Sequence, residues 1–156
     1  MMKCEKTFLL VEDDPYDVVF VQEEFRRARG SARLRVVYDG VEAMHYVSGH
    51  GDYADRRKYP KPDVILLDLK MPRWDGFEFL EWLRAKSPQQ DRSVPVMVLS
   101  ASNVPEHLAR AYALGANGCL AKPIEWNKFQ QHLAALGIYW TALVESPQPQ
   151  PISPGA

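Results

Sequence analysis

The sequence predicts an α/β protein built on a single doubly wound parallel sheet of five strands. Five short apolar runs recur along the 156 residues, at positions 7–11, 34–38, 63–67, 94–99 and 118–121. Each run is followed by a segment whose apolar residues recur at helical spacing. Strands that alternate with helices in this way form parallel sheets with helices on both faces.

The third run fits a central strand. Residues 64–67 are apolar at every position, as expected of a strand that helices cover on both faces. Asp68 follows this run directly and precedes a Met-Pro turn and the Asp75-Gly76 step. Open α/β sheets bind ligands at the carboxyl ends of their strands, so Asp68 is a candidate functional residue.

Each helix is predicted from a start signal and an apolar stripe. Asp14 can cap a helix that begins at Pro15 and stops at Gly30. The other helices are expected to begin at Gly40, near Phe77, at Pro105 and near Glu125, the last one ending near Leu136. In the flavodoxin-like strand order 2-1-3-4-5, the first and third strands are neighbours.

Two segments are expected to lie outside this regular framework. Residues 50–61 are mostly polar and leave little to bury, so the sequence predicts a long loop that is disordered or used for recognition. The proline-rich end, residues 146–156, has too few apolar residues to pack and is expected to be a disordered tail.

Composition excludes several classes of protein. The 19 basic and 20 acidic residues give a formal charge of −1, which offers no electrostatic basis for binding nucleic acid or an anionic membrane. No apolar segment approaches 18 residues, and the N-terminus does not resemble a signal peptide. The two cysteines form no metal or disulfide framework. We therefore expect a cytoplasmic protein.

Polar residues at the predicted strand ends point to phosphate chemistry. Glu12, Asp13 and Asp68 would meet where the first and third strands end, and carboxylates are the ligands that Mg²⁺ prefers. Lys122 and Ser100, which end the fifth and fourth strands, can reach phosphate oxygens. Each feature alone is commonly structural, for example a helix cap or a turn. Together they predict a phosphoryl acceptor with Asp68 as the nucleophile.

These motifs resemble the receiver domain of two-component response regulators. The resemblance is carried by residues 9–15 (Leu-Leu-Val-Glu-Asp-Asp-Pro), 66–72 (Leu-Leu-Asp-Leu-Lys-Met-Pro), Asp75-Gly76, 99–101 (Leu-Ser-Ala) and Lys122-Pro123, and it covers roughly residues 5 to 136. It implies a flavodoxin-like receiver fold and a phosphoacceptor rather than an enzyme. Asp68 would accept a phosphoryl group from a histidine kinase.

The resemblance also implies the roles of the other site residues. Asp13, Asp68 and the backbone carbonyl of Lys70 would bind Mg²⁺, while Glu12 would act through a water molecule. Ser100 and Lys122 would contact the phosphoryl group, and the Lys122-Pro123 peptide bond would be cis. Receivers usually carry Tyr or Phe three residues before this lysine as a switch, and here Cys119 stands there.

A narrower resemblance links the chain to the single-domain regulators that partner bacterial phytochromes. It is carried by residues 39–43 (Asp-Gly-Val-Glu-Ala), residues 51–56 (Gly-Asp-Tyr-Ala-Asp-Arg) and the late Tyr-Trp pair. It implies a phytochrome kinase as partner and a receiver of residues 5–145, whose helical extension, about 137–145, forms a homodimer. The predicted dimer residues are Tyr139, Trp140, Leu143 and Val144. Alternatively, these side chains fold back on their own domain.

Two other functions stay open. A pseudo-receiver would act only through protein contacts, and Cys119 leaves room for it. A phosphohydrolase of the haloacid dehalogenase type would also use a strand-end aspartate, but it needs a second aspartate where this chain has Lys70. No DNA-binding module is expected after the receiver, so output would pass through protein contact or phosphate relay.

Overall fold

The computed structural model describes residues 6–28, 32–101 and 104–135, and it contains one parallel sheet of five strands. The strand order is β2-β1-β3-β4-β5, which confirms the predicted fold class and order. The strands are β1 (Thr7–Val11), β2 (Arg33–Val37), β3 (Val64–Asp68), β4 (Val96–Ser100) and β5 (Gly118–Ala121).

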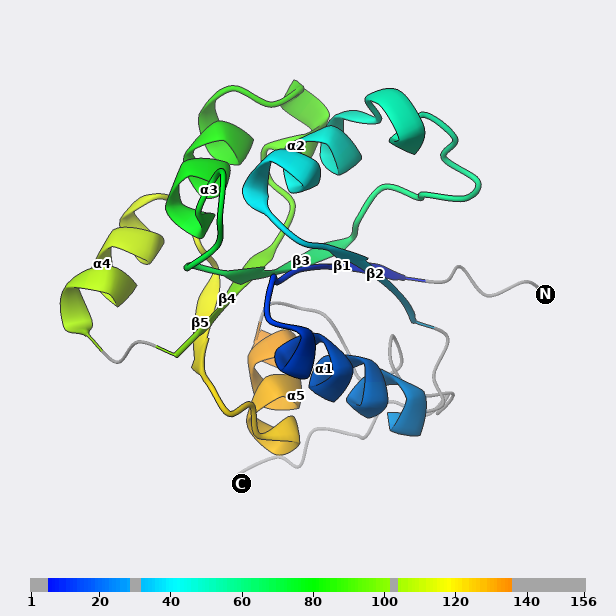
Figure 1. Ribbon diagram of the computed structural model, residues 1–156. Helices are drawn as coiled ribbons and strands as arrows, with labels where there is room; N and C mark the ends of the chain where they lie inside the picture. Colours follow the sequence, from blue (N-terminus) through cyan, green and yellow to red (C-terminus); the bar gives the residue numbers. More distant parts are fainter. Residues whose placement is uncertain (1–5, 29–31, 102–103, 136–156) are drawn as a thin grey trace, which may run out of the picture.

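Helices cover both faces of the sheet (Figure 1). They are α1 (Pro15–Ala28), α2 (Gly40–Ser48), α3 (Gly76–Ala85), α4 (Pro105–Ala113) and α5 (Trp126–Ala135), with short 3-10 helices η1 (Gly51–Tyr53) and η2 (Gln89–Asp91). Helices α2 and α3 lie on one face, and α1 and α5 lie on the other. Helix α4 shares the face of α3, since its Ala111 belongs to the same apolar core.

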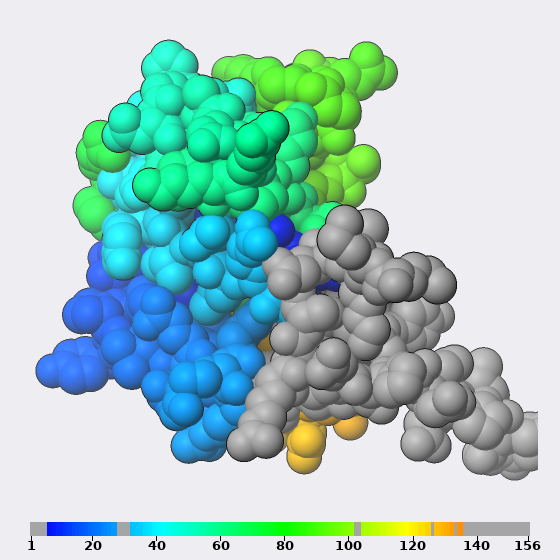
Figure 2. All heavy atoms as spheres, turned by 90° about the vertical axis from the view of Figure 1, so that its right-hand side faces the viewer, coloured from blue at the N-terminus to red at the C-terminus, as the bar shows by residue number. Residues whose placement is uncertain are grey.

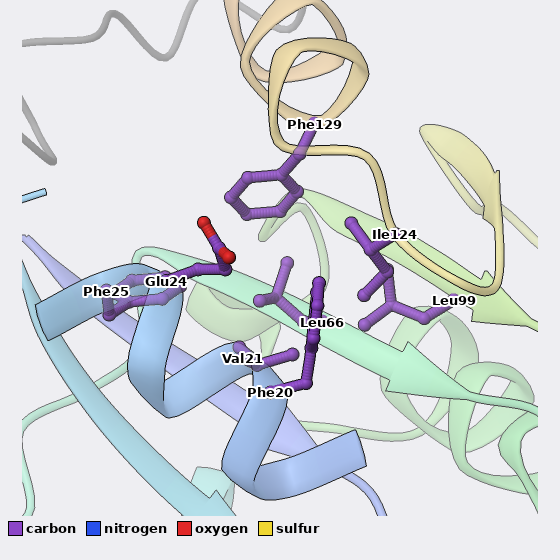
Figure 3. Close-up of a pocket in the computed structure, with 8 residues that line it drawn as sticks. All are labelled: Phe20, Val21, Glu24, Phe25, Leu66, Leu99, Ile124 and Phe129. Carbon is purple, nitrogen blue, oxygen red and sulfur yellow. The ribbon is translucent and has the colours of Figure 1, made fainter. Parts of the chain in front are cut away.

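The three central strands are buried along their whole length, as their apolar sequences predicted. Their side chains alternate between two cores, one on each face of the sheet. In the core under α1 and α5, the ring of Phe25 lies 5.1 Å from that of Phe8 and 6.3 Å from that of Phe129. Figure 3 shows side chains from α1, α5 and the central strands converging there. This packing fixes both helices beneath the sheet.

Three strands differ from the prediction by one or two residues at both ends. Strand β3 includes Asp68, which pairs with Leu99 of β4, so the aspartate is the last residue of the strand. Strand β2 ends before Tyr38, because the N–H of Tyr38 donates instead to the Glu42 carboxylate at the start of α2. Strand β4 begins two residues late, because the N–H of Val94 closes a turn onto Asp91.

The segment 50–61 buries no residue fully, as its polar sequence predicted, but its half-buried residues pack against α2. Its Tyr53 and Tyr59 rings lie 5.0 and 5.9 Å from the ring of Tyr46 on α2. Arg56 donates to the carbonyls of Tyr46 and Val47, at 2.8 and 2.7 Å, where α2 ends. Figure 2 shows the segment as a compact mass against the domain. Aromatic side chains scattered among polar residues supply this small core.

Several predicted features lie outside the described residues. These are the helical extension 137–145, the tail 146–156, and the predicted dimer residues Tyr139, Trp140, Leu143 and Val144. Among the helices of the described ranges, none is both long and apolar enough to cross a membrane.

Candidate functional site

The carboxyl edge of the sheet holds a cleft of about 270 Å³. The predicted residues Glu12, Asp13, Asp68, Ser100 and Lys122 all line it, although they come from four different strand ends. Parallel register brings them together: Val11 pairs with Leu67, Asp68 with Leu99, and Ser100 with Ala121. Further lining is contributed by Asp14, Asp17, Leu69, Lys70, Phe77, Ala101 and His107.

Three carboxylates gather on one side of the cleft. Each of Glu12, Asp13 and Asp68 offers one oxygen, and these oxygens lie within 4.8 Å of one another. Glu12 and Asp68 are buried, whereas Asp13 is exposed. Opposite ligands of one octahedral Mg²⁺ lie about 4 Å apart. The oxygen donors and their spacing therefore fit a hard divalent cation at the mouth of the cleft.

Lys122 also lines the cleft, and its ammonium group contacts three carboxylates, two of which belong to this acidic cluster. Its Nζ lies 2.5 Å from Glu12 Oε2, 2.9 Å from Asp17 Oδ2 and 3.5 Å from Asp68 Oδ1. Lys122 directly follows β5, and the Lys122-Pro123 peptide bond is cis, as the resemblance implied. One ammonium group thus faces three acidic side chains.

The pKa values reflect this excess of negative charge. Burial raises the pKa of Glu12 to about 7, and the negative charge of Asp68 adds to the effect, although the hydrogen bond from Lys122 opposes it. Burial also raises the pKa of Asp68, against the attraction of Lys122. For Lys122, burial lowers the pKa, but the hydrogen bonds to Glu12 and Asp17 outweigh it and raise the pKa overall. A bound cation would relieve the repulsion among the carboxylates.

The loop after Asp68 is held close to the end of β3. The N–H of Gly76 donates to the Leu69 carbonyl at 2.9 Å, and a Cβ on Gly76 would lie 2.4 Å from the carbonyl oxygen of Asp68. Only glycine allows this approach. Asp75 and Glu78 form a capping box that starts α3. The Asp-Gly step therefore anchors the loop that follows Asp68 and carries Lys70.

Helix α2 is tied to the same loop. Arg73 adopts a left-handed conformation with a φ of 63°. Its guanidinium donates from Nε to Asp39 Oδ2 at 2.8 Å and from Nη2 to Asp39 Oδ1 at 3.1 Å. Asp39 in turn accepts from the N–H of Glu42 and so caps α2. A bidentate pair of this kind fixes orientation as well as distance.

Sequence reasoning missed Asp17 and His107. Asp17 lies in the first turn of α1 and binds Lys122 from a position 105 residues away in the chain. His107 lines the cleft from α4, with its ring 6.2 Å from that of Phe77. The four-residue spacing between Asp13 and Asp17, with a helix starting between them, was the signal available for Asp17. Nothing in the sequence places His107 at the cleft.

Cys119 does not line the cleft. It is half-buried on β5 and packs against the core beneath α3 and α4. The phenol of Tyr112, half-exposed on α4, forms a hydrogen bond with the Cys119 side chain. An aromatic side chain therefore contacts this position of β5, although it comes from α4 instead of from the strand.

Residues 8–134 match the family described as the response regulator receiver domain. The chain belongs to this family.

This receiver is homologous to the phytochrome response regulators. A solved structure of the bacteriophytochrome response regulator RtBRR is 38% identical, has a TM-score of 0.77, and covers 94% of this chain and 86% of its own. The response regulator RPA3017 in red light signaling of R. palustris is 35% identical, with a TM-score of 0.73 and 92% and 99% coverage. Response regulator Rcp1 of Synechocystis is 31% identical over 91% of this chain and 93% of its own length.

The known properties of receiver domains indicate what a cleft of this kind does. Receiver domains of response regulators act as phosphoacceptors, partner with histidine kinases, and bind a divalent metal at an acidic cluster. A structure of Rcp1 in a Mn²⁺-bound form is 29% identical to this receiver, with a TM-score of 0.70 and 93% and 99% coverage. The described part of this chain also has a group of three carboxylates, Glu12, Asp13 and Asp68, that could hold a metal ion.

Proposed function

We propose that this receiver accepts a phosphoryl group on Asp68 from a histidine kinase and acts as a response regulator in two-component signalling. The observation that carries the proposal is the place of the Asp68 carboxylate. It is buried and lines the cleft, its oxygen lies within 4.8 Å of a carboxylate oxygen of Glu12 and of Asp13, and its Oδ1 lies 3.5 Å from Lys122 Nζ. A phosphoryl group entering the cleft would meet the nucleophile and its neutralising charges together.

The reaction follows from these positions. An oxygen of Asp68 attacks the phosphorus of a kinase phosphohistidine, the P–N bond breaks, and the imidazole leaves with the electron pair and takes up a proton. Lys122 exchanges one of its carboxylate partners for a phosphoryl oxygen. The hydroxyl of Ser100, on the neighbouring strand end, donates to another oxygen.

The proposed metal is Mg²⁺. Asp13, Asp68 and the backbone carbonyl of Lys70 would hold it, with Glu12 acting through a water molecule. Bound there, it would neutralise the incoming phosphate and the carboxylates. The donor set supports this assignment, because all the side chains concerned offer hard oxygen ligands.

Incubation with acetyl phosphate and Mg²⁺ tests the acceptor. Intact-mass spectrometry is expected to show the gain of one phosphoryl group by the wild type and none by Asp68→Asn. Asp52→Asn, which removes an exposed aspartate in η1 far from the cleft, serves as the matched control and should be modified like the wild type. Equal modification of Asp68→Asn would overturn the assignment, and no modification of the wild type would favour a pseudo-receiver.

We further propose that the kinase is a bacterial phytochrome. The homology to several phytochrome response regulators supports this partner. Phosphotransfer from a panel of autophosphorylated histidine kinases of the source cell tests it. Transfer from a phytochrome kinase should be fastest at short times, and faster transfer from an unrelated kinase would contradict the proposal.

We also propose that the receiver of residues 5–145 forms a homodimer through its extension, about 137–145, followed by the tail 146–156. The apolar sequence of Tyr139, Trp140, Leu143 and Val144 supports this proposal. Sedimentation of the full chain should show a dimer that the double variant Trp140→Ser, Leu143→Ser dissociates. Tyr16→Ser removes an exposed aromatic of α1 and should leave the dimer intact. A wild-type monomer would contradict the proposal.

A further inference from the structure

A groove runs along the outer side of α3, separate from the cleft. Its lining consists of Trp74, Glu78, Glu81, Trp82 and Lys86, and its volume is about 180 Å³. Apart from the adjacent Glu81 and Trp82, these residues recur every three to four positions, so they form one stripe from the loop before α3 to the residue after it. No residue of the groove lines the cleft that holds Asp68.

Both tryptophans are held in place, Trp74 through its backbone and Cβ and Trp82 through its ring. The carbonyl of Trp74 accepts from the N–H of Gly40 at 3.0 Å, and a Cβ on Gly40 would lie 2.5 Å from the Trp74 Cβ, so the start of α2 packs directly on this residue. The ring of Trp82 lies 6.0 Å from that of Phe79 and packs against the core. Trp74 and Trp82 are both only half-buried. The groove therefore presents two half-buried indoles, of which that of Trp82 is packed against the core and that of Trp74 is carried by a fixed backbone, and such preorganisation lowers the entropic cost of binding.

The charges in the groove favour a cation. An oxygen of Glu78 accepts from the N–H of Asp75 at 3.3 Å, so this carboxylate is oriented by the capping box. Glu81 is exposed and, among the described residues, makes no ion pair. Lys86 contributes the single positive charge. Two carboxylates against one ammonium leave a net negative groove beside two indole faces.

We propose that this groove binds the cationic side chain of a partner protein, with arginine preferred over lysine. A guanidinium stacks on an indole face and can pair with a carboxylate at the same time, which an ammonium does less well. The groove is smaller than the 300–1,000 Å³ typical of drug-sized ligands, so it fits one side chain of a basic segment. Trp and Arg are also the residues that dominate binding energy at protein interfaces.

This inference goes beyond the phosphoacceptor role and does not depend on it. The groove faces solvent from α3, whereas phosphate would enter at the carboxyl edge of the sheet. A protein that failed to accept phosphate could still bind a basic segment here. Conversely, an unresponsive groove would leave the assignment of Asp68 untouched.

A peptide titration tests the proposal. The probe is acetyl-Gly-Arg-Gly-amide, compared with the lysine peptide and with the citrulline peptide, which has the shape of arginine without its charge. The readout is the pair of indole N–H signals of Trp74 and Trp82 in ¹⁵N correlation spectra, assigned with Trp74→Phe and Trp82→Phe. Both signals should shift with millimolar arginine peptide, less with lysine peptide, and not with citrulline peptide.

Charge variants distinguish the effect of charges in the groove from the effect of the protein's net charge. Glu81→Gln should weaken binding of the arginine peptide about threefold, the size expected for one exposed ion pair. Lys86→Gln should strengthen it by a similar factor. Glu106→Gln changes the net charge as Glu81→Gln does, but on exposed α4, and should leave the dissociation constant unchanged.

Three results would overturn the proposal. The first is equal shifts with the citrulline peptide, which would show that charge is not recognised. The second is an equal effect of Glu81→Gln and Glu106→Gln, which would reduce the effect to net charge. The third is self-association of the chain that Glu81→Lys abolishes, which would assign the groove to a second copy in place of a partner protein.

Discussion

At the scale of single residues, burial and the contact with Tyr112 together determine the pKa of the Cys119 thiol. Burial raises the pKa of Cys119, and the hydrogen bond from Tyr112 partly offsets the increase. A raised thiol pKa lowers the thiolate fraction at neutral pH, and the thiolate is the reactive species. Cys119 is therefore a core residue in contact with an aromatic side chain. Its low reactivity does not favour a role as a redox sensor.

Alkylation rates test this reading of Cys119. In a Cys4→Ser background, iodoacetamide at pH 8 should modify the folded protein at least about tenfold more slowly than the guanidinium-unfolded chain. Tyr112→Phe removes the bond that stabilises the thiolate, so it should raise the pKa further and slow the reaction at a given pH. Rates read by mass spectrometry across pH 7 to 10 provide the comparison. A faster reaction in the folded protein would contradict it.

At the scale of elements, Arg84 locks α3 to its surroundings. Its guanidinium donates to the carbonyls of Gly115, Arg92 and Val94 and to the side chain of Asn117, at 2.7 to 3.0 Å. Burial lowers its pKa, so the group is held against a desolvation cost. One side chain at the end of α3 thereby joins the α4–β5 turn to the entry of β4.

Removing this lock should destabilise the fold. Arg84→Ala is expected to lower the free energy of unfolding by about 3 kcal/mol, because several carbonyls lose a charged donor at once. Arg84→Lys should recover only part of the loss, since an ammonium lacks the planar fork. Arg92→Ala removes a single bond, to the carbonyl of Ser87, and should cost about 1 kcal/mol. Urea denaturation measures all three, and equal losses would contradict the account.

The packed segment 50–61 gives a second prediction at this scale. The Tyr53 hydroxyl donates to Glu42 at 2.6 Å, so Tyr53→Phe should destabilise the protein by about 1 kcal/mol. Tyr38→Phe alters a half-exposed phenol of similar size and serves as the control. Amide hydrogen exchange in Tyr53→Phe should accelerate within 50–61 and spare the sheet. Uniform acceleration over the whole domain would show that the segment is not a separate unit.

At the scale of the whole molecule, the buried carboxylates of the cleft lower the stability of the folded protein. Asp68 and Glu12 are buried with raised pKa values. A raised carboxyl pKa in the folded state means that the ionised group costs stability at a pH above it. Without a cation, the folded protein therefore carries an unfavourable cluster that a ligand can relieve.

Thermal unfolding should reveal this coupling. Mg²⁺ at one hundred times its dissociation constant should stabilise the wild type by about 2.7 kcal/mol through mass action. Asp68→Asn should be more stable than the wild type in a chelator, because it removes a buried charge, and should gain little from Mg²⁺. Asp52→Asn should behave like the wild type in both conditions. Stabilisation of Asp68→Asn by Mg²⁺ to the same extent would place the ion elsewhere.

The sequence by itself determined the sheet and the residues at its strand ends. The central strands are formed by largely apolar runs, Asp13, Asp68 and Ser100 lie at or just after their carboxyl ends, and Lys122 follows the edge strand β5. Parallel strands place their carboxyl ends at one edge. Local sequence therefore sufficed to predict the strands and the residues at their ends, whereas the strand order was taken from the known order of flavodoxin-like sheets.

The tertiary structure decided what depends on residues distant in the chain. Local sequence patterns do not predict which side chains such contacts bring together. Examples are the hydrogen bond between Lys122 and Asp17, the tyrosine packing of 50–61, the contact of Tyr112 with Cys119 and the α3 groove. Such contacts are set by the angles and distances at which whole elements pack. Periodicity along the chain reports which face of an element is buried, but not which partner covers it.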